Sequence, residues 1–234
     1  MIAERLKQLL FPLRCPVCDR IVVPYGEKIC PECLPKLRIL VQPYCMKCGK
    51  KLQKEGELCK DCAEKGHAFT RGRALYEYES VAASIYRLKY GGRQEYADFF
   101  GGELAYYFED FIRRAAPDAI IPIPLHRKRM CRRGYNQALL LARGMGRKLG
   151  IPVMEKVLIR VKNTVPLKLL NPKERQNNLK KAFIIKKNDV KLKTVILVDD
   201  IYTTGSTIDE ATRTLMACGV EHVYFVALAC GAGV

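Results

Sequence analysis

The stretch "VILVDDIYTTGST", Val195 to Thr207, decides the fold. Its apolar start has the composition of a buried strand, and two acids, Asp199 and Asp200, stand at the carboxyl end of that strand. A turn rich in hydroxyl groups then runs into the helical pattern of residues 206–219. Turn amides and the start of a helix together form a site for a phosphate monoester. A solvated strand end followed by capping hydroxyls is the alternative, but it does not explain why all these features occur together.

The two acids indicate what kind of molecule carries that phosphate. Carboxylates repel a phosphate, but they accept hydrogen bonds from neighbouring ribose hydroxyls and stabilise positive charge that develops on the sugar. We therefore expect a ribose 5-phosphate ligand, with Asp199 and Asp200 as the catalytic candidates. The candidates for the loop that holds the 5-phosphate are Thr203, Thr204, Gly205, Ser206 and Thr207.

The chain after residue 70 predicts an α/β fold, with a mostly parallel sheet flanked by helices. Apolar runs alternate there with helical patterns, which is typical of such sheets. Ligands of these folds bind beyond the carboxyl ends of the strands, where Asp199 and Asp200 are expected. The expected strands are 74–78, 119–124, 153–159, 182–185, 194–199 and 222–229, and the expected helices lie within 80–115, 136–150 and 206–219.

Eight of the eleven cysteines form four C-x-x-C pairs within the first 62 residues. Each pair can place two thiolates on one ion, and two pairs complete a tetrahedral four-cysteine zinc site. A disulfide scaffold would need an oxidising compartment, and no feature of the chain directs it to one. We therefore predict two structural Zn²⁺ sites in a domain of residues 1–70, followed by a second domain of residues 71–234. The expected ligands are Cys15, Cys18, Cys30, Cys33, Cys45, Cys48, Cys59 and Cys62.

Two pairings of the C-x-x-C turns fit their near-equal spacing. Sequential pairing gives two zinc ribbons in tandem and is the form we favour, whereas interleaved pairing gives a cross-braced module. Either arrangement closes each site with four thiolates, so neither leaves a position open for a substrate. The sites are therefore expected to contribute folding free energy and a surface for a partner.

The formal net charge of +17 is concentrated in one window of the chain. Residues 120–181 contain sixteen Lys or Arg and only two acids, Glu155 and Glu174, which gives this window a net charge of +14. An ordinary solvated surface mixes both signs of charge. The window therefore predicts contact with a polyanion such as a nucleic acid.

The sequence offers no segment suited to a membrane. No run approaches the roughly 20 apolar residues that a transmembrane helix needs. Residues 1–15 alternate apolar positions with charges, as in a short amphipathic helix rather than the core of a signal peptide. We expect a soluble, cytoplasmic protein without membrane insertion.

The stretch from Val195 to Thr207 resembles, at every position, the 5-phosphoribosyl-1-pyrophosphate (PRPP) motif of type I phosphoribosyltransferases. The resemblance implies that Asp199 and Asp200 engage the ribose hydroxyls of PRPP and that the following loop holds its 5-phosphate. It also implies a Mg²⁺ ion that bridges ribose and pyrophosphate oxygens.

Two further segments, "IPIPLHRKRMCRRGYNQALLLA" (121–142) and "RQNNLKKAF" (175–183), make the chain similar to the ComF family of competence-related proteins over almost its whole length. The cations of the first segment are expected in one loop, suited to a pyrophosphate or to DNA phosphates. His126 in that segment is expected to be a loop residue without a catalytic role. The candidates for these phosphates are Lys89, Arg127, Lys128, Arg129, Arg132, Arg133 and Arg175.

Two functional hypotheses follow from the sequence. In the first, the protein binds PRPP and acts in DNA uptake during natural transformation. Single-stranded DNA then lies on the 120–181 window beside Tyr135, and a DNA-uptake or helicase protein is a further partner. In the second, the protein is an active Mg²⁺-dependent phosphoribosyltransferase that moves ribose 5-phosphate from PRPP to an unidentified base or amine, without direct DNA contact. No segment indicates a pocket for the acceptor, so both hypotheses stay open at this stage.

Overall fold

The computed structural model describes residues 12–24, 26–162, 182–185 and 191–231. The expected N-terminal helix and the phosphate candidate Arg175 lie outside these residues.

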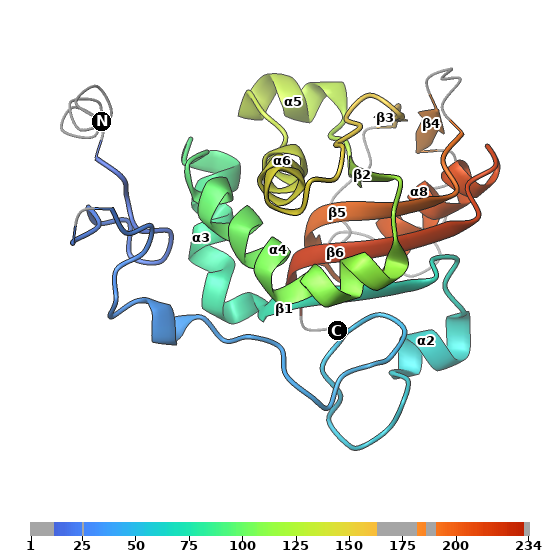
Figure 1. The fold of residues 1–234 in the computed structure, drawn as a ribbon, viewed down its shortest axis with the longest axis horizontal. Helices are drawn as coiled ribbons and strands as arrows, with labels where there is room; N and C mark the ends of the chain where they lie inside the picture. The colour runs from blue at the N-terminus through green and yellow to red at the C-terminus, as the bar shows by residue number, and fades with distance from the viewer. Residues whose placement is uncertain (1–11, 25, 163–181, 186–190, 232–234) are drawn as a thin grey trace.

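A four-stranded parallel sheet forms the centre of the molecule (Figure 1). Its strand order is β1-β6-β5-β2, and each neighbouring pair runs in the same direction. The apolar run of the central strand β5 is fully buried, which is typical of parallel sheets covered on both faces. The expected α/β fold with a mostly parallel sheet is confirmed. The strands are β1 (Arg71–Glu77), β2 (Ala119–Pro122), β5 (Thr194–Tyr202) and β6 (His222–Cys230).

The long helices occupy the expected segments, and two other segments differ from expectation. The cations expected in one loop lie instead on a short helix, which begins at the cap His126, where the Nδ1 atom accepts a hydrogen bond from the Lys128 amide, and ends at Gly134. The expected strand 153–159 is reduced to a bridge between Val153 and Ile120, and a separate two-stranded antiparallel sheet follows. The helices are η1 (Leu34–Lys36), α2 (Lys60–Lys65), α3 (Tyr78–Tyr90), α4 (Tyr96–Ala115), α5 (Arg127–Arg133), α6 (Gln137–Leu149) and α8 (Ser206–Met216), and the small sheet consists of β3 (Leu158–Arg160) and β4 (Phe183–Ile185).

In the part of the chain that the structure describes, no helix combines the length and the apolar character that crossing a bilayer requires.

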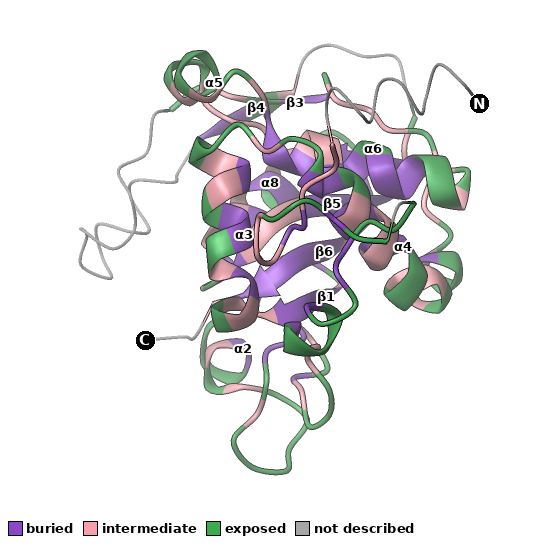
Figure 2. Ribbon diagram, turned by 90° about the vertical axis from the view of Figure 1, so that its left-hand side faces the viewer, coloured by how far each residue is buried: buried purple, intermediate pink, exposed green. Residues whose placement is uncertain are grey.

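Successive residues of the central strands point to opposite faces of the sheet and build two separate cores. Ile196 and Val198 of β5 pack on one face with residues from α3, α4 and α6. Val195 and Leu197 pack on the other face with α8 and the small β3–β4 sheet. Figure 2 shows the buried strands between helices whose outer sides are exposed.

Helices α4 and α6 approach each other closely at a pair of glycines. A Cβ atom on Gly101 would lie 2.9 Å from the Leu141 carbonyl oxygen and 3.0 Å from the Cα atom of Gly144. Only a residue without a side chain fits at this crossing. The close contact helps to hold the helical layer flat against the sheet.

The N-terminal cysteine-rich segment divides between the two cores. Cys15, Cys30 and Cys33 belong to the core of α3 and α4, whereas Cys45 and Cys48 belong to the core below α8. Between them, the chain crosses the free edge of β1, where the Leu40 amide donates to the Leu75 carbonyl at 2.8 Å and the Glu77 amide donates to the Arg38 carbonyl at 2.8 Å. Figure 1 shows this path, from the first cysteine group beside α3 to the second below β1.

Candidate functional site

The two acids lie where β5 loses one of its neighbours. Pairing between β5 and β2 ends at Val198, whereas pairing between β5 and β6 continues to Tyr202. Asp199 and Asp200 are therefore on a strand end that is open on the β2 side. The strand itself is longer than expected, since β5 continues to Tyr202 rather than ending at Asp199.

The turn after the acids has the shape that the sequence predicts. Gly205 caps α8 with a φ of +78°, a left-handed conformation that favours glycine, and the Asp209 amide donates to its carbonyl at 2.8 Å. The hydroxyls of Thr204 and Ser206 are 2.9 Å apart. A hydroxyl-lined turn thus leads directly into the N-terminus of an eleven-residue helix.

A lysine from another element reaches the second acid. Lys89, in the last turn of α3, places its Nζ atom 2.6 Å from Oδ2 of Asp200, and the two side chains are only 16% and 13% exposed. Lys89, predicted as a phosphate candidate, is thus placed beside the acids by the fold. This contact is held by Tyr135, whose hydroxyl donates to the Leu88 carbonyl at 2.6 Å. Tyr135 thus anchors α3 rather than offering a free ring at the surface.

Asp199 has a strongly shifted acidity. Burial, followed by the negative charge of Asp200, raises its pKa to about 7. The positive charges of Lys89 and Arg160 act in the opposite direction. An acid with a pKa in this range can gain or lose a proton near neutral pH.

Two arginines complete the charged surroundings of the acids. Burial, followed by the charge of Arg129, lowers the pKa of Arg160 in β3 to about 10, and Asp199 opposes that shift. Burial, followed by Arg133, lowers the pKa of Arg129 in α5, and Asp200 opposes that shift. The positive charges of these arginines therefore repel one another beside the two carboxylates, and a bound polyanion would relieve this repulsion.

The other cations of α5 lie in different surroundings. Arg133 donates to the Tyr90 hydroxyl at 3.0 Å and stacks over its ring, and the Arg132 guanidinium lies 5.9 Å from the centre of the same ring. Arg127 and Lys128 are exposed on the outer side of the helix. The predicted phosphate candidates are thus divided: among those that the structure describes, Lys89 and Arg129 interact with the acids and the others do not.

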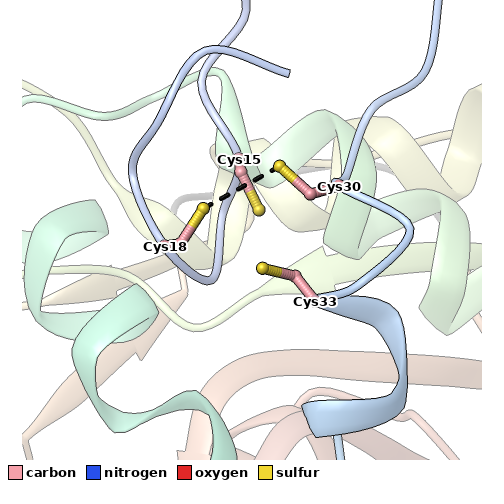
Figure 3. A group of neighbouring side chains, drawn as sticks. All are labelled: Cys15, Cys18, Cys30 and Cys33. Atoms are coloured by element: carbon pink, nitrogen blue, oxygen red, sulfur yellow. Dashed lines mark hydrogen bonds between the residues drawn. The ribbon is translucent and has the colours of Figure 1, made fainter. Parts of the chain in front are cut away.

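The first group of cysteines has the geometry of a zinc site. The Sγ atoms of Cys15, Cys18, Cys30 and Cys33 all lie within 4.8 Å of one another (Figure 3). Those of Cys18 and Cys30 are 3.8 Å apart. A tetrahedral ion with Zn–S bonds of about 2.3 Å separates its sulfurs by about 3.8 Å, so this group fits Zn²⁺.

The second group repeats this geometry with Cys45, Cys48, Cys59 and Cys62. The Sγ atoms of Cys48 and Cys59 are 3.7 Å apart. The pairing is therefore sequential, as favoured from the sequence, and each group belongs to one ribbon. Beside the second group, Lys50 and Asp61 form an ion pair of 2.8 Å between side chains that are 11% and 29% exposed.

Comparison with known proteins assigns the family. Residues 6–63 match the model of the double zinc ribbon domain, and residues 141–232 match that of the phosphoribosyl transferase domain. Competence protein F of Haemophilus influenzae is 34% identical, over 94% of this chain and 97% of its own. The chain belongs to the ComF family. Competence protein ComFC of Bacillus subtilis is 30% identical over 82% of this chain and 80% of its own, and DNA utilization protein YhgH of Escherichia coli K12 is 29% identical over 92% and 96%.

In this ComF chain, the second ribbon packs against the end of β5, next to the turn of residues 203–207. Cys45, Cys48 and Cys62 share one core with Tyr202, the last residue of β5. The ring of Tyr202 also stacks on that of Phe225, with centroids 4.6 Å apart. The second four-cysteine group, which is expected to stabilise the fold of the ribbon, therefore packs with Tyr202, the residue that precedes the turn.

His67 makes a second connection between the ribbon and the loop. Its Nδ1 atom lies 2.7 Å from Oδ2 of Asp209 in α8, and its ring stacks on Phe69 at 4.8 Å. The Ala68 amide donates to the same carboxyl group at 2.8 Å. The segment between the second ribbon and β1 is thus fastened to the first turn of the helix that follows the loop.

The sequence did not single out Arg160 or His67 in this ComF chain. Arg160 lies 39 positions before Asp199 and was one of sixteen cations in its window, so no local signal distinguished it. His67 lies between a cysteine pair and a strand, without a motif around it.

Proposed function

We propose that this protein binds PRPP at the carboxyl end of β5 and acts in the uptake or use of DNA. The observation that carries the proposal is the convergence of Asp199, Asp200, Lys89, Arg129 and Arg160 beside a turn that enters a helix. Carboxylates for ribose hydroxyls, cations for a pyrophosphate and amides for a monoester are the three recognition elements that PRPP requires.

Each group of residues takes one part of the ligand. The loop Thr203–Thr207 binds the 5-phosphate through its amides and hydroxyls. Asp199 and Asp200 accept hydrogen bonds from the ribose hydroxyls. Lys89, which now neutralises Asp200 at 2.6 Å, and Arg129 provide the positive charge for the pyrophosphate.

A Mg²⁺ ion fits the same place. Magnesium prefers carboxylate and phosphate oxygens and usually keeps several waters, and the two carboxylates at the end of β5 are such ligands. When bound with PRPP, the ion would neutralise charge on the pyrophosphate.

The exposed cations of α5 favour single-stranded DNA as a second ligand. Arg127 and Lys128 face outward, away from the contacts of the acids, and Arg132 and Arg133 lie beside the half-exposed ring of Tyr90. Cations next to an aromatic ring suit a strand whose bases stack and whose phosphates need neutralising. The names of the relatives, which refer to competence and DNA utilization, support this assignment.

Transfer of ribose 5-phosphate to a base or amine is the second candidate function. The raised pKa of Asp199, about 7, favours it, because a general base is most effective near the working pH. In this candidate, Asp199 accepts the proton that the attacking amine loses.

Calorimetric titration with PRPP and Mg²⁺ tests the site. The double variant Asp199→Asn with Asp200→Asn is expected to lose PRPP binding, whereas Asp118→Asn is the matched control. Asp118 accepts hydrogen bonds from the Lys193 and Thr194 amides at the opposite end of β5. Unchanged PRPP affinity in the double variant would contradict the ribose assignment.

Titration with single-stranded DNA at about 50 and 200 mM salt tests the second ligand. Affinity is expected to fall with salt, and the double variant Arg127→Gln with Lys128→Gln to weaken DNA binding while PRPP binding is kept. DNA affinity that is independent of salt would contradict an electrostatic surface.

We also propose the division at residues 70 and 71, which the start of β1 at Arg71 supports. A cytoplasmic location fits the two four-thiolate sites, because such sites need reduced cysteines.

A further inference from the structure

A cavity of about 610 Å³ lies along the outer edge of β1. It is bounded by the second ribbon, by β1 itself, by the last turns of α4 and by Tyr224 near the start of β6. Because β6 lies between β1 and β5, this cavity is two strands away from Asp199 and Asp200. It therefore belongs to neither of the surfaces discussed above.

Three arginines line this cavity without a carboxylate partner. Among the residues that the structure describes, no acid lies within 4.0 Å of the charged groups of Arg71, Arg73 or Arg114. The one acid in the lining is Asp110, which is exposed. The guanidinium groups of Arg71 and Arg73 donate hydrogen bonds to backbone carbonyls of Met46, Cys45 and Gly72, and that of Arg71 also contacts the Met46 sulfur.

Arg73 is half-buried and lies in the same lining as a second cation, Arg71. A half-buried cation next to a second cation is unfavourable unless a negative charge is added. The cavity thus favours an anionic ligand.

Aromatic rings give the same cavity a second kind of recognition. The Arg73 guanidinium is 4.2 Å from the centre of the Tyr44 ring and 5.8 Å from that of the Phe111 ring. Phe111 meets Tyr224 edge-on at 5.9 Å, and Tyr107 adds a ring that is 44% exposed. Flat aromatic faces beside guanidinium groups are the surfaces on which nucleobases stack.

We propose that this cavity binds a nucleotide unit, with the base against the rings of Tyr44 and Tyr107 and the phosphate on Arg71, Arg73 and Arg114. The unit is either a free nucleotide or one residue of a nucleic acid single strand, since both present a base joined to a phosphodiester or phosphomonoester. This inference does not rest on the PRPP site or on the cations of α5. It adds a nucleotide site to the second ribbon, which at its other side supports the phosphate loop.

The test uses the whole protein and the neighbouring arginines of α4. Arg114 lines the cavity, whereas Arg113, one position earlier, is paired with Glu109 at 2.7 Å and lies outside the lining. Arg114→Ala and Arg113→Ala are titrated calorimetrically with thymidine 3′-monophosphate, which lacks the 5-phosphate that the loop would bind. The same variants are titrated with a single-stranded thymidine oligonucleotide of about twelve residues.

The expected result is a loss of affinity of about ten-fold or more in Arg114→Ala, because a charged hydrogen bond to the phosphate is removed, and little change in Arg113→Ala. If Arg114→Ala weakens binding of the mononucleotide alone, the ligand is a free nucleotide. If Arg114→Ala weakens binding of the oligonucleotide, and the wild type binds the oligonucleotide more tightly than the mononucleotide, the ligand is a nucleic acid single strand. Equal behaviour of the two variants with both probes overturns the proposal, as does the absence of mononucleotide and oligonucleotide binding by the wild type.

A second measurement guards against misfolding. Arg114 is exposed, so the unfolding midpoint of Arg114→Ala is expected to match that of Arg113→Ala within experimental error. Photo-cross-linking of an oligonucleotide that carries 5-iodouracil is expected to mark Tyr44 or Tyr107. Cross-links confined to α5 would overturn the proposal even if DNA binds.

Discussion

Substituting Gly205 by alanine is expected to damage the phosphate loop in a way that the structure allows us to quantify. The left-handed φ of +78° costs a residue with a side chain about 1–2 kcal/mol. The added Cβ atom would also lie 2.8 Å from Cε1 of His67 and 2.8 Å from the Tyr202 hydroxyl. His67 cannot move away freely, because Asp209 and Phe69 hold its ring. Overpacking of this kind costs about 1–3 kcal/mol, for a total of about 2–5 kcal/mol.

The control variant Gly150→Ala separates the conformational cost of the left-handed φ from the cost of overpacking. Gly150 ends α6 with a φ of +71° and has open space where a Cβ atom would lie, so only the conformational cost of about 1–2 kcal/mol applies. Urea unfolding of the zinc-loaded protein, compared at equal m-values, measures both variants. Gly205→Ala is expected to be less stable than Gly150→Ala by about 1–3 kcal/mol and to bind PRPP more weakly. Equal losses of stability would refute the claim that His67 and Tyr202 fix the loop from below.

Three further predictions concern the acids, the zinc sites and the helix crossing. The pKa of Asp199, raised from 3.8 to about 7, means that the folded state holds this proton more tightly than the unfolded state. The stability that this protonated carboxyl contributes is therefore lost as the pH rises from about 4 to 7. The urea midpoint of Asp199→Asn should therefore increase relative to that of the wild type between pH 5 and 8. A difference between the two midpoints that does not change with pH would contradict the burial argument. Cys48→Ser should weaken PRPP binding in calorimetry more than Cys18→Ser does, because only the second ribbon shares a core with Tyr202. Cys18→Ser should mainly lower thermal stability, and equal effects of the two variants on affinity would argue against that division. Gly101→Ala should lower the unfolding free energy by about 1–3 kcal/mol by forcing α4 and α6 apart, and a neutral result would show that the helices can separate without cost.

The second ribbon contacts both the end of β5 and the cavity along the edge of β1. One side of it packs with Tyr202 beneath the loop, and another side, at Tyr44 and Gly49, forms a wall of the arginine-lined cavity. Loss of its zinc is therefore expected to disturb both places, whereas loss of the first zinc disturbs the packing of α3 and α4.

Much of the architecture was predictable because it follows from local patterns of apolar residues, turn residues and cysteines in the sequence. Alternating apolar strands and helices gave the parallel sheet, and the thirteen residues from Val195 to Thr207 gave the acids, the turn and the helix start. The C-x-x-C spacing gave two four-cysteine groups, which the fold forms sequentially. In each case the residues concerned are close in the chain, so periodicity and turn chemistry are sufficient signals.

The two errors have different causes, one local and one that depends on residues far apart in the sequence. The cations 127–133 lack the apolar spacing of a helix that packs, yet His126 caps them and they form α5. Residues 153–159 have the composition of a strand, but only Val153 reaches β2, and β3 pairs with β4 instead. Strand pairing depends on which edge is free, and that information is not local.

By itself, the sequence determined the fold class, the zinc ligands and the position of the acid pair, because each follows from short-range spacing. Only the tertiary structure brought Lys89, Arg129 and Arg160 to those acids, placed His67 behind Gly205 and left three arginines without acids in one cavity. Burial and the mutual approach of charges set these properties, and both arise only when distant segments pack together.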